Sequence, residues 1–120
     1  MIQSYKELIV WQKSMDLVVL VYILTEGFPK EELYGLTTQM RRAAVSIPSN
    51  IAEGKLRGSR KEFIQYLRIA YGSGGELETQ IEIAKRLPKT ADLDFTKVDG
   101  LLSEVMKMLN GLISKLQDKS

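Results

Sequence analysis

The 120-residue sequence contains no cysteine and no histidine. The absence of cysteine excludes disulfides, thiolate metal sites and cysteine nucleophiles, and it fits a reducing compartment. The absence of histidine removes the usual general base, the commonest metal ligand and the Glu-x-x-His pairs of di-iron bundles. We therefore expect no catalytic residues, no metal and no cofactor in this chain.

Long hydrophobic runs and a secretion signal are also missing. The longest apolar run, Leu17–Leu24, is far shorter than the roughly 20 residues that cross a bilayer. The N-terminus lacks a basic start, an apolar stretch and a small-residue cleavage site. We expect a soluble, cytoplasmic protein without a membrane partner. With 44% hydrophobic and 27% charged residues, the chain is typical of one globular domain, residues 1–120.

Apolar residues recur at steps of three and four in four segments, which is the spacing of amphipathic helices. No segment alternates with a period of two, so we expect no strands. The pattern predicts an all-α, antiparallel up-down-up-down four-helix bundle with helices at about 7–26, 33–56, 59–87 and 94–117. The four stripes are Leu8, Trp11, Met15, Val18, Tyr22; Leu33, Leu36, Met40, Ala43, Ile47, Ile51; Phe63, Leu67, Ala70, Gly74, Leu77, Ile81, Ala84; and Phe95, Val98, Leu102, Val105, Leu109, Leu112, Leu116.

Turn and capping residues separate the four stripes. The tripeptide "GFP" follows the first helix, and "GKLRG" closes the second. Ser59 with Glu62 three residues later has the capping-box pattern for the third helix. Asp92 or Asp94 is suited to cap the fourth helix.

The third segment contains the sequence "GSGG" at residues 72–75. Its apolar stripe stays in phase through Gly74, so we predict one continuous helix although each interior glycine costs about 1 kcal/mol relative to alanine. Equal steps from a turn at residue 58 set Ala43 and Ala44 opposite this stretch, which favours close helix packing. A hinge or a phosphate-binding loop is the alternative, but a phosphate loop normally follows a strand and carries a lysine.

Two features of the first two helices need an explanation. Pro48 interrupts the second stripe without changing its phase, so we predict a kinked but continuous helix, the alternative being a break at residues 46–49. The first helix is apolar on nearly every side between Leu17 and Leu24. This excess predicts burial against another copy of the chain, the alternative being a wide core-facing stripe.

Three segments resemble a known family: "LIVWQKSMDLVVLVY"; "FPKEELYGLTTQMRRAAVSIPSNIAEGKLRGSRKEFIQYLRIAYGSGGELETQIEIAKRL", of which "QMRRAAVSIPSNIAEG" is the most specific part; and "MLNGLI". The resemblance covers essentially the whole chain and is to the bacterial four-helix-bundle proteins encoded in intervening sequences of 23S ribosomal RNA genes. It implies a four-helix bundle, ring-shaped homopentamers and no established enzymatic activity. A similar fold serves as the accessory variability protein of diversity-generating retroelements, where a basic surface binds nucleic acid and a reverse transcriptase. The pair Gly74-Gly75 departs from the family, which more often has bulkier residues there.

Positive charge is concentrated in residues 41–68, the basic hairpin. It carries seven Lys or Arg residues and two Glu residues, a net +5 in a chain of net charge +2. Such cations are suited to phosphates, and few aromatic residues accompany them, so we expect backbone-directed binding of RNA or DNA with weak sequence selectivity. An ordinary solvated turn is the alternative. The candidate nucleic-acid-binding residues are Lys55, Arg57, Arg60, Lys61 and Arg68.

Arg41 and Arg42 are interpreted differently, as structural residues that pair with Glu76 or Glu78, with a secondary binding role as the alternative. A competing hypothesis is an enzyme that uses Glu53, Glu78 and Glu82 as paired carboxylates. Solvated salt bridges explain these residues better. Glu53 is expected to form an ion pair or a helix cap near the turn. A protein-binding scaffold without nucleic-acid binding is the remaining alternative.

Overall fold

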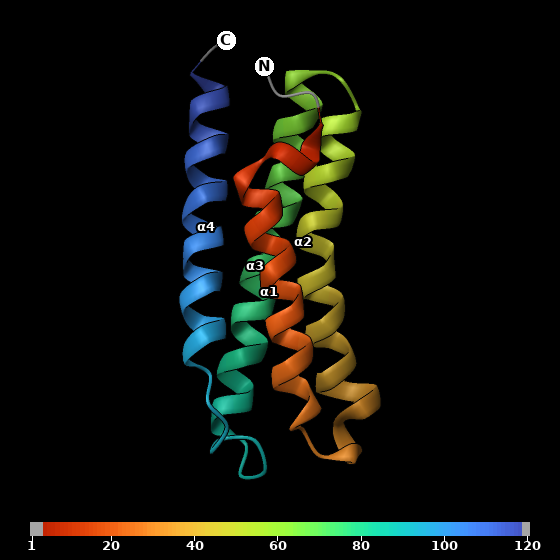
Figure 1. Cartoon of the computed structure of the whole chain (residues 1–120), viewed down its shortest axis with the longest axis vertical. Helices are drawn as coiled ribbons and strands as arrows, with labels where there is room; N and C mark the ends of the chain where they lie inside the picture. The colour runs from red at the N-terminus through yellow and green to blue at the C-terminus, as the bar shows by residue number, and fades with distance from the viewer. Residues whose placement is uncertain (1–3, 119–120) are drawn as a thin grey trace.

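The computed structural model describes residues 4–118, which form four long helices with short connections. The chain reverses direction at each connection, so that the turn at residues 57–59 lies at one end of an elongated bundle and the other two connections lie at the opposite end (Figure 1). The bundle measures 48 × 20 × 19 Å. No strand occurs within residues 4–118, and the predicted all-α four-helix bundle is confirmed. The helices are α1 (Ile9–Glu26), α2 (Thr38–Leu56), α3 (Arg60–Arg86) and α4 (Thr96–Gln117).

The core forms where the apolar stripes of α2, α3 and α4 meet. Met40 and Ile47 of α2, Leu67 and Leu77 of α3, and Leu109 of α4 are completely buried. These side chains belong to the stripes predicted from the sequence. Burying each one contributes about 1.5–3 kcal/mol relative to leaving it in water, so the apolar spacing largely determines how these three helices face one another.

The predicted core face of α1 is partly right: three of its five residues pack, half-buried, against the core, but none of the five is fully buried. Leu17 and Val21 are completely buried, whereas Met15 and Tyr22 of the predicted stripe are each 41% exposed. The reason is that α1 is apolar on nearly every side between Leu17 and Leu24, so this part of the helix has no polar face that fixes which side turns inward. As a consequence, a second apolar face of α1 remains on the surface.

The α1–α2 connection differs from the prediction in its detail. Lys30–Glu32 forms a short 3-10 helix and Leu33–Thr37 a π-helical turn, so α2 begins at Thr38 and not at residue 33. Gly35 leaves the helical region inside this turn, with φ −116° and ψ −110°. Pro48 is buried within an unbroken α2, which confirms the predicted continuity of this helix.

α3 continues without interruption through the "GSGG" stretch, as predicted. The expected reason for the glycines is corrected. A Cβ atom added to Gly74 would lie 2.2 Å from Sδ of Met106, so Gly74 makes room for α4. A Cβ added to Gly72 or Gly75 would meet nothing within 4 Å, so these two residues do not serve helix packing within the chain.

The register between α2 and α3 also differs from the expected one. The Ser46 and Ser73 hydroxyls are hydrogen-bonded at 2.8 Å, which shifts the pairing by three residues from equal steps around residue 58. The close approach of the two helices occurs at Gly54, where an added Cβ would lie 2.5 Å from the Tyr66 Cβ. Gly54 is a buried residue of α2, and this helix ends at Leu56, within the segment "GKLRG", as predicted.

Candidate nucleic-acid interface

The α2–α3 turn has three residues with distinct conformational roles. Arg57 follows the last residue of α2 and still has helical dihedrals. Gly58 has φ +86°, a left-handed conformation that side-chain-bearing residues rarely adopt. The Ser59 hydroxyl accepts a hydrogen bond from the Glu62 backbone N–H at 3.1 Å and donates one to Glu62 Oε1 at 3.1 Å. The predicted cap is thereby confirmed, and α3 starts at a defined residue.

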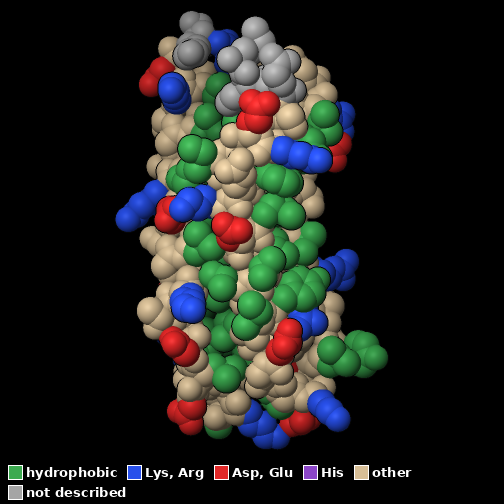
Figure 2. All heavy atoms as spheres, in the orientation of Figure 1, with side chains coloured by type: hydrophobic (Ala, Val, Ile, Leu, Met, Phe, Trp, Pro, Cys, Tyr) green, Lys and Arg blue, Asp and Glu red, His purple; other side chains and the backbone are tan. Residues whose placement is uncertain are grey.

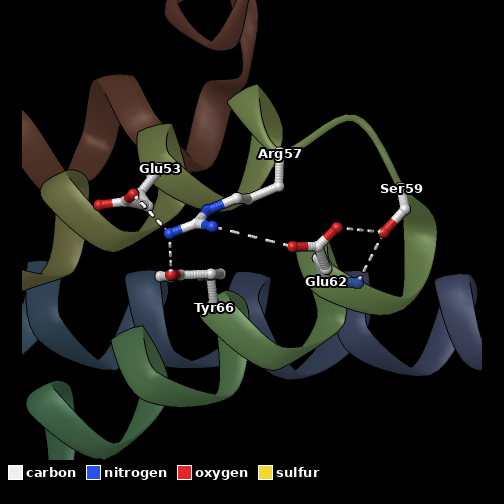
Figure 3. Close-up of polar contacts among 5 residues, drawn as sticks. All are labelled: Glu53, Arg57, Ser59, Glu62 and Tyr66. Atoms are coloured by element: carbon white, nitrogen blue, oxygen red, sulfur yellow. Dashed lines mark hydrogen bonds and ion pairs between the residues drawn. The ribbon is translucent and has the colours of Figure 1, made fainter.

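Arg57 is the most extensively bonded cation of the hairpin. Its Nη2 donates to the Tyr66 hydroxyl at 2.7 Å and to Glu53 Oε2 at 3.1 Å, while its Nη1 lies 4.0 Å from Glu62 Oε2. The guanidinium also lies over the Tyr66 ring, 5.1 Å from its centroid. Figure 3 shows Arg57 reaching from the end of α2 toward the first turns of α3. The interaction with Tyr66, followed by the hydrogen bond with Glu53, raises the pKa of Arg57 above its ordinary value.

Lys55 lies on the other side of the same end of α2. Its ammonium group is 5.5 Å from the centroid of the Phe63 ring, and its side chain is half-buried. Together with Arg60 and Leu116, these residues line an open hollow of about 280 Å³. Lys55 and Arg60 therefore supply positive charge to a surface depression with an apolar floor.

Lys61 and Arg68 are exposed on the first turns of α3. They are seven residues apart, and two turns of helix bring them to the same face. Within residues 4–118, neither side chain forms an ion pair. The structure thus distributes the predicted site residues over the turn and the outer face of α3.

The two mid-helix arginines do not pair as expected. Arg41 turns toward α1, where its Nε donates to Thr25 Oγ1 at 2.9 Å and its guanidinium lies 4.5 Å from the Tyr22 ring centroid. Arg42 forms no ion pair with any residue of the described range 4–118. The expected ion pairs with Glu76 or Glu78 do not form within residues 4–118. The reasons are that α2 is shifted along α3 and that Arg41 points toward α1 and not toward α3.

An exposed apolar face covers the outer side of α1 and its border with α2. Figure 2 shows hydrophobic side chains gathered over α1 in the orientation of Figure 1. Val19 and Ile23 are 57% and 59% exposed. Val45 of α2 lines two open hollows beside this face, of about 460 and 360 Å³. The apolar face comprises Met15, Val19, Tyr22, Ile23 and Val45.

Two of the three carboxylates that were considered for catalysis, Glu53 and Glu82, have cationic partners. Glu53 bonds to Arg57, as expected for a residue near the turn, and Glu82 accepts a hydrogen bond from Lys85 at 3.1 Å. Lys85 also donates a hydrogen bond to Asp99 at 2.7 Å. The hydrogen bond with Asp99, followed by that with Glu82, raises the pKa of Lys85. Among the described residues, no group of three or more acidic side chains is placed to hold a metal ion.

Sequence reasoning missed Tyr66, which joins Arg57 to α3. The available signal was an aromatic residue one turn after Glu62 on the side of α3 that faces α2. A hairpin drawn with equal steps does not place that side chain beside Arg57.

Comparison with known proteins assigns the chain to a family. The family model described as "23S rRNA-intervening sequence protein" matches residues 6–111. The chain belongs to this family. One solved structure that is similar to this chain is described as a protein with unknown function from the S23 ribosomal protein family of Bacteroides thetaiotaomicron.

That structure supports the fold of this 23S rRNA-intervening sequence protein. The two chains are 24% identical and superpose with a TM-score of 0.72, over 88% of this chain and 98% of the other. No curated protein matches the chain significantly. Within the described residues, every helix is too short or too polar to cross a membrane.

Proposed function

We propose that this protein is a non-enzymatic homo-oligomer that binds nucleic acid, RNA or DNA, through the basic hairpin. The observation that carries the proposal is the net +5 of residues 41–68 in a chain of net charge +2, from seven basic and two acidic side chains. The fold brings much of this charge to one end of the bundle, at the turn between α2 and α3. A cationic end of this kind attracts phosphates by a field that salt screens.

The chemistry of the hairpin favours phosphates over bases. Lys and Arg side chains bind phosphate oxygens by charge and by forked hydrogen bonds. The aromatic rings near the turn, Phe63 and Tyr66, are each covered by a cation and take part in helix packing. Binding is therefore directed at the sugar-phosphate backbone, with weak sequence selectivity. Membership in the 23S rRNA-intervening sequence protein family is compatible with an RNA ligand.

Gel-shift measurements with duplex RNA and DNA oligonucleotides at two salt concentrations test this proposal. We expect binding at low salt that weakens steeply at high salt, because bound cations release condensed counterions. The informative variant replaces Lys55, Arg60, Lys61 and Arg68 by glutamine, and it should bind much more weakly. Its matched control replaces four cations outside the hairpin, which keeps the change in net charge the same. These control residues are Lys30, Arg86, Lys97 and Lys107.

Oligomerisation is the second part of the proposal. The exposed apolar face around Val19 and Ile23 is the kind of surface that soluble monomers seldom expose and that contacts between copies bury. The resemblance to ring-forming proteins favours a homopentamer. A ring repeats the basic hairpin in every copy, and repeated sites on one nucleic acid raise the avidity.

Light scattering at micromolar concentration measures the oligomeric state directly. We expect a pentamer for the wild type and a monomer for the variant Val19→Lys/Ile23→Lys, because its interface would bury two unpaired charges. The matched control places lysine at Gln12 and Gln65, which are exposed polar positions. A monomeric wild-type protein refutes this part of the proposal.

A protein-binding scaffold without nucleic-acid binding is the second candidate function. The same apolar face favours it, and a partner such as a reverse transcriptase follows from the family resemblance. The salt dependence separates the two candidates, because docking on apolar surface does not weaken as salt rises. Binding to a protein partner that persists at high salt, with no binding of RNA or DNA at low salt, supports the scaffold.

A further inference from the structure

The contacts of Arg57 set it apart from the other cations of the hairpin. A guanidinium has five N–H donors in a fixed plane. Here Nη2 donates to both the Tyr66 hydroxyl and Glu53, Nη1 faces Glu62, and the guanidinium carbon lies over the Tyr66 ring. A phosphate that bound Nη1 or Nη2 of Arg57 would compete with these partners. It would also come close to two carboxylates, which repel it.

The partners of Arg57 come from both sides of the turn. Glu53 belongs to the last turn of α2, whereas Glu62 and Tyr66 belong to the first two turns of α3. Glu62 is held in addition by Ser59, the residue that starts α3 (Figure 3). Arg57 therefore ties the end of one helix to the start of the next across Gly58, the residue with the left-handed conformation.

We propose that Arg57 is a positioning residue that fixes the α2–α3 turn, and that Lys61 and Arg68 are the residues that contact nucleic-acid phosphates. This inference rests on the proposed function and assigns separate roles within the same site. Arg57 contributes by holding the start of α3 in place, and with it the outer face that carries the two ligands.

The position of Lys61 and Arg68 suits two phosphates of one nucleic acid. Seven residues of α-helix span about 10.5 Å, so the two cations, each on a long flexible side chain, lie close enough to reach two different phosphates of one nucleic acid. Gln65 lies between the two cations on the same face and carries no charge. No acidic partner neutralises either cation within residues 4–118, so both keep their full positive charge for a ligand.

The salt dependence of binding tests this division of roles. Binding of duplex DNA is measured by fluorescence anisotropy at several salt concentrations for the wild type and for Arg57→Gln, Arg57→Lys, Lys61→Gln and Arg68→Gln. The slope of log K against log salt is negative, and each lost phosphate contact makes it shallower by about 0.9. We expect this change for Lys61→Gln and for Arg68→Gln. For Arg57→Gln we expect an unchanged slope and a similar loss of affinity at every salt concentration.

The lysine variant separates positioning from phosphate contact. Lysine keeps the charge but has a single nitrogen on a flexible stem, so it does not bridge Tyr66 and the two carboxylates as a planar guanidinium does. We expect Arg57→Lys to behave like Arg57→Gln. The inference is overturned if Arg57→Gln lowers the slope as much as Lys61→Gln does and Arg57→Lys restores it.

Thermal unfolding tests, independently of any ligand, whether the contact between Arg57 and Tyr66 fixes the α2–α3 turn. The melting temperatures of Arg57→Gln, Tyr66→Phe and the double variant form a double-mutant cycle at fixed protein concentration. We expect the double variant to lose less than the sum of the single losses, because each change breaks the same contact. Additive losses of melting temperature would contradict a stabilising contact between Arg57 and Tyr66. A wild-type protein that binds no nucleic acid refutes the proposed function and the ligand roles of Lys61 and Arg68, whereas the cycle still decides the role of Arg57.

Discussion

Replacing Gly54 by alanine should destabilise the protein, although alanine is the better helix former. The new Cβ would lie 2.5 Å from the Tyr66 Cβ and 3.2 Å from Phe63 Cδ1. Carbon atoms in contact are normally about 3.5–4.0 Å apart, so the two helices must separate by about 1 Å. The 2.5 Å contact joins two Cβ atoms, and each Cβ is bonded directly to its backbone. A change of side-chain rotamer therefore does not relieve this contact.

Two opposing contributions set the size of this effect. Overpacking a well-packed interface costs about 1–3 kcal/mol, and this contact belongs at the upper end because backbone must move. The gain in helix propensity from glycine to alanine is about 1 kcal/mol. The net loss in the free energy of unfolding is therefore about 1–2 kcal/mol.

Urea unfolding followed by circular dichroism at fixed protein concentration measures this change. Gly75→Ala is the matched control, because a Cβ at Gly75 would meet nothing within 4 Å of the chain. We expect the control to gain about 1 kcal/mol from helix propensity alone. If Gly54→Ala were as stable as the wild type or more stable, the close approach of α2 and α3 at Gly54 would be refuted.

Three further changes test individual features of the fold. Ser59→Ala removes the cap of α3 and should lower the free energy of unfolding by about 1 kcal/mol in urea melts; an unchanged midpoint would contradict the role of the cap. Gly74→Leu should cost roughly 1–3 kcal/mol or more by overpacking against Met106, and a stable variant would show that α4 yields easily. The Thr96 backbone N–H lowers the pKa of Asp94, so its contribution to stability is present above the ordinary aspartate pKa and is lost as pH falls through the lowered value. Thermal melts across the acid range should show this loss in the wild type and a smaller one in Asp94→Asn; identical profiles would refute the assignment.

The apolar spacing of the sequence was sufficient to predict three of the four helix faces. In α3 the stripe from Phe63 to Ala84 is interrupted by glycines but never changes phase, so continuity followed directly. The face of α1 did not follow, because Val19 and Ile23 are as apolar as Leu17 and Val21. Only the packing of the other three helices selects which of these pairs is buried.

The register of α2 against α3 required information that the spacing does not contain. Equal steps around residue 58 assume that both helices leave the turn alike. Here Arg57 still has helical dihedrals whereas Ser59 is extended, so the two helices leave the turn differently, and Ser46 and not Ala43 lies beside Ser73. The same shift explains why the expected partners of the mid-helix arginines were wrong.

The candidate site was predictable as a region and not as a set of roles. The charge count pointed to the α2–α3 turn, and the structure brings Lys55, Arg57, Arg60 and Lys61 to that end of the bundle. It treated Lys55, Arg57 and Lys61 as equivalent, because a count of charges does not include hydrogen bonds. Glu53, Glu62 and Tyr66 make Arg57 different, and that difference depends on the close approach of two helices.

The salt dependence of nucleic-acid binding by the wild type and by the four-glutamine variant is the measurement that tests the central claim most directly. We expect log K for duplex DNA to fall linearly with log salt in the wild type. Loss of Lys55, Arg60, Lys61 and Arg68 should reduce that slope markedly, whereas the matched control variant should keep it. Absence of binding by the wild type at low salt, or the same slope for the four-glutamine variant and the wild type, would contradict a phosphate-binding function of the basic hairpin.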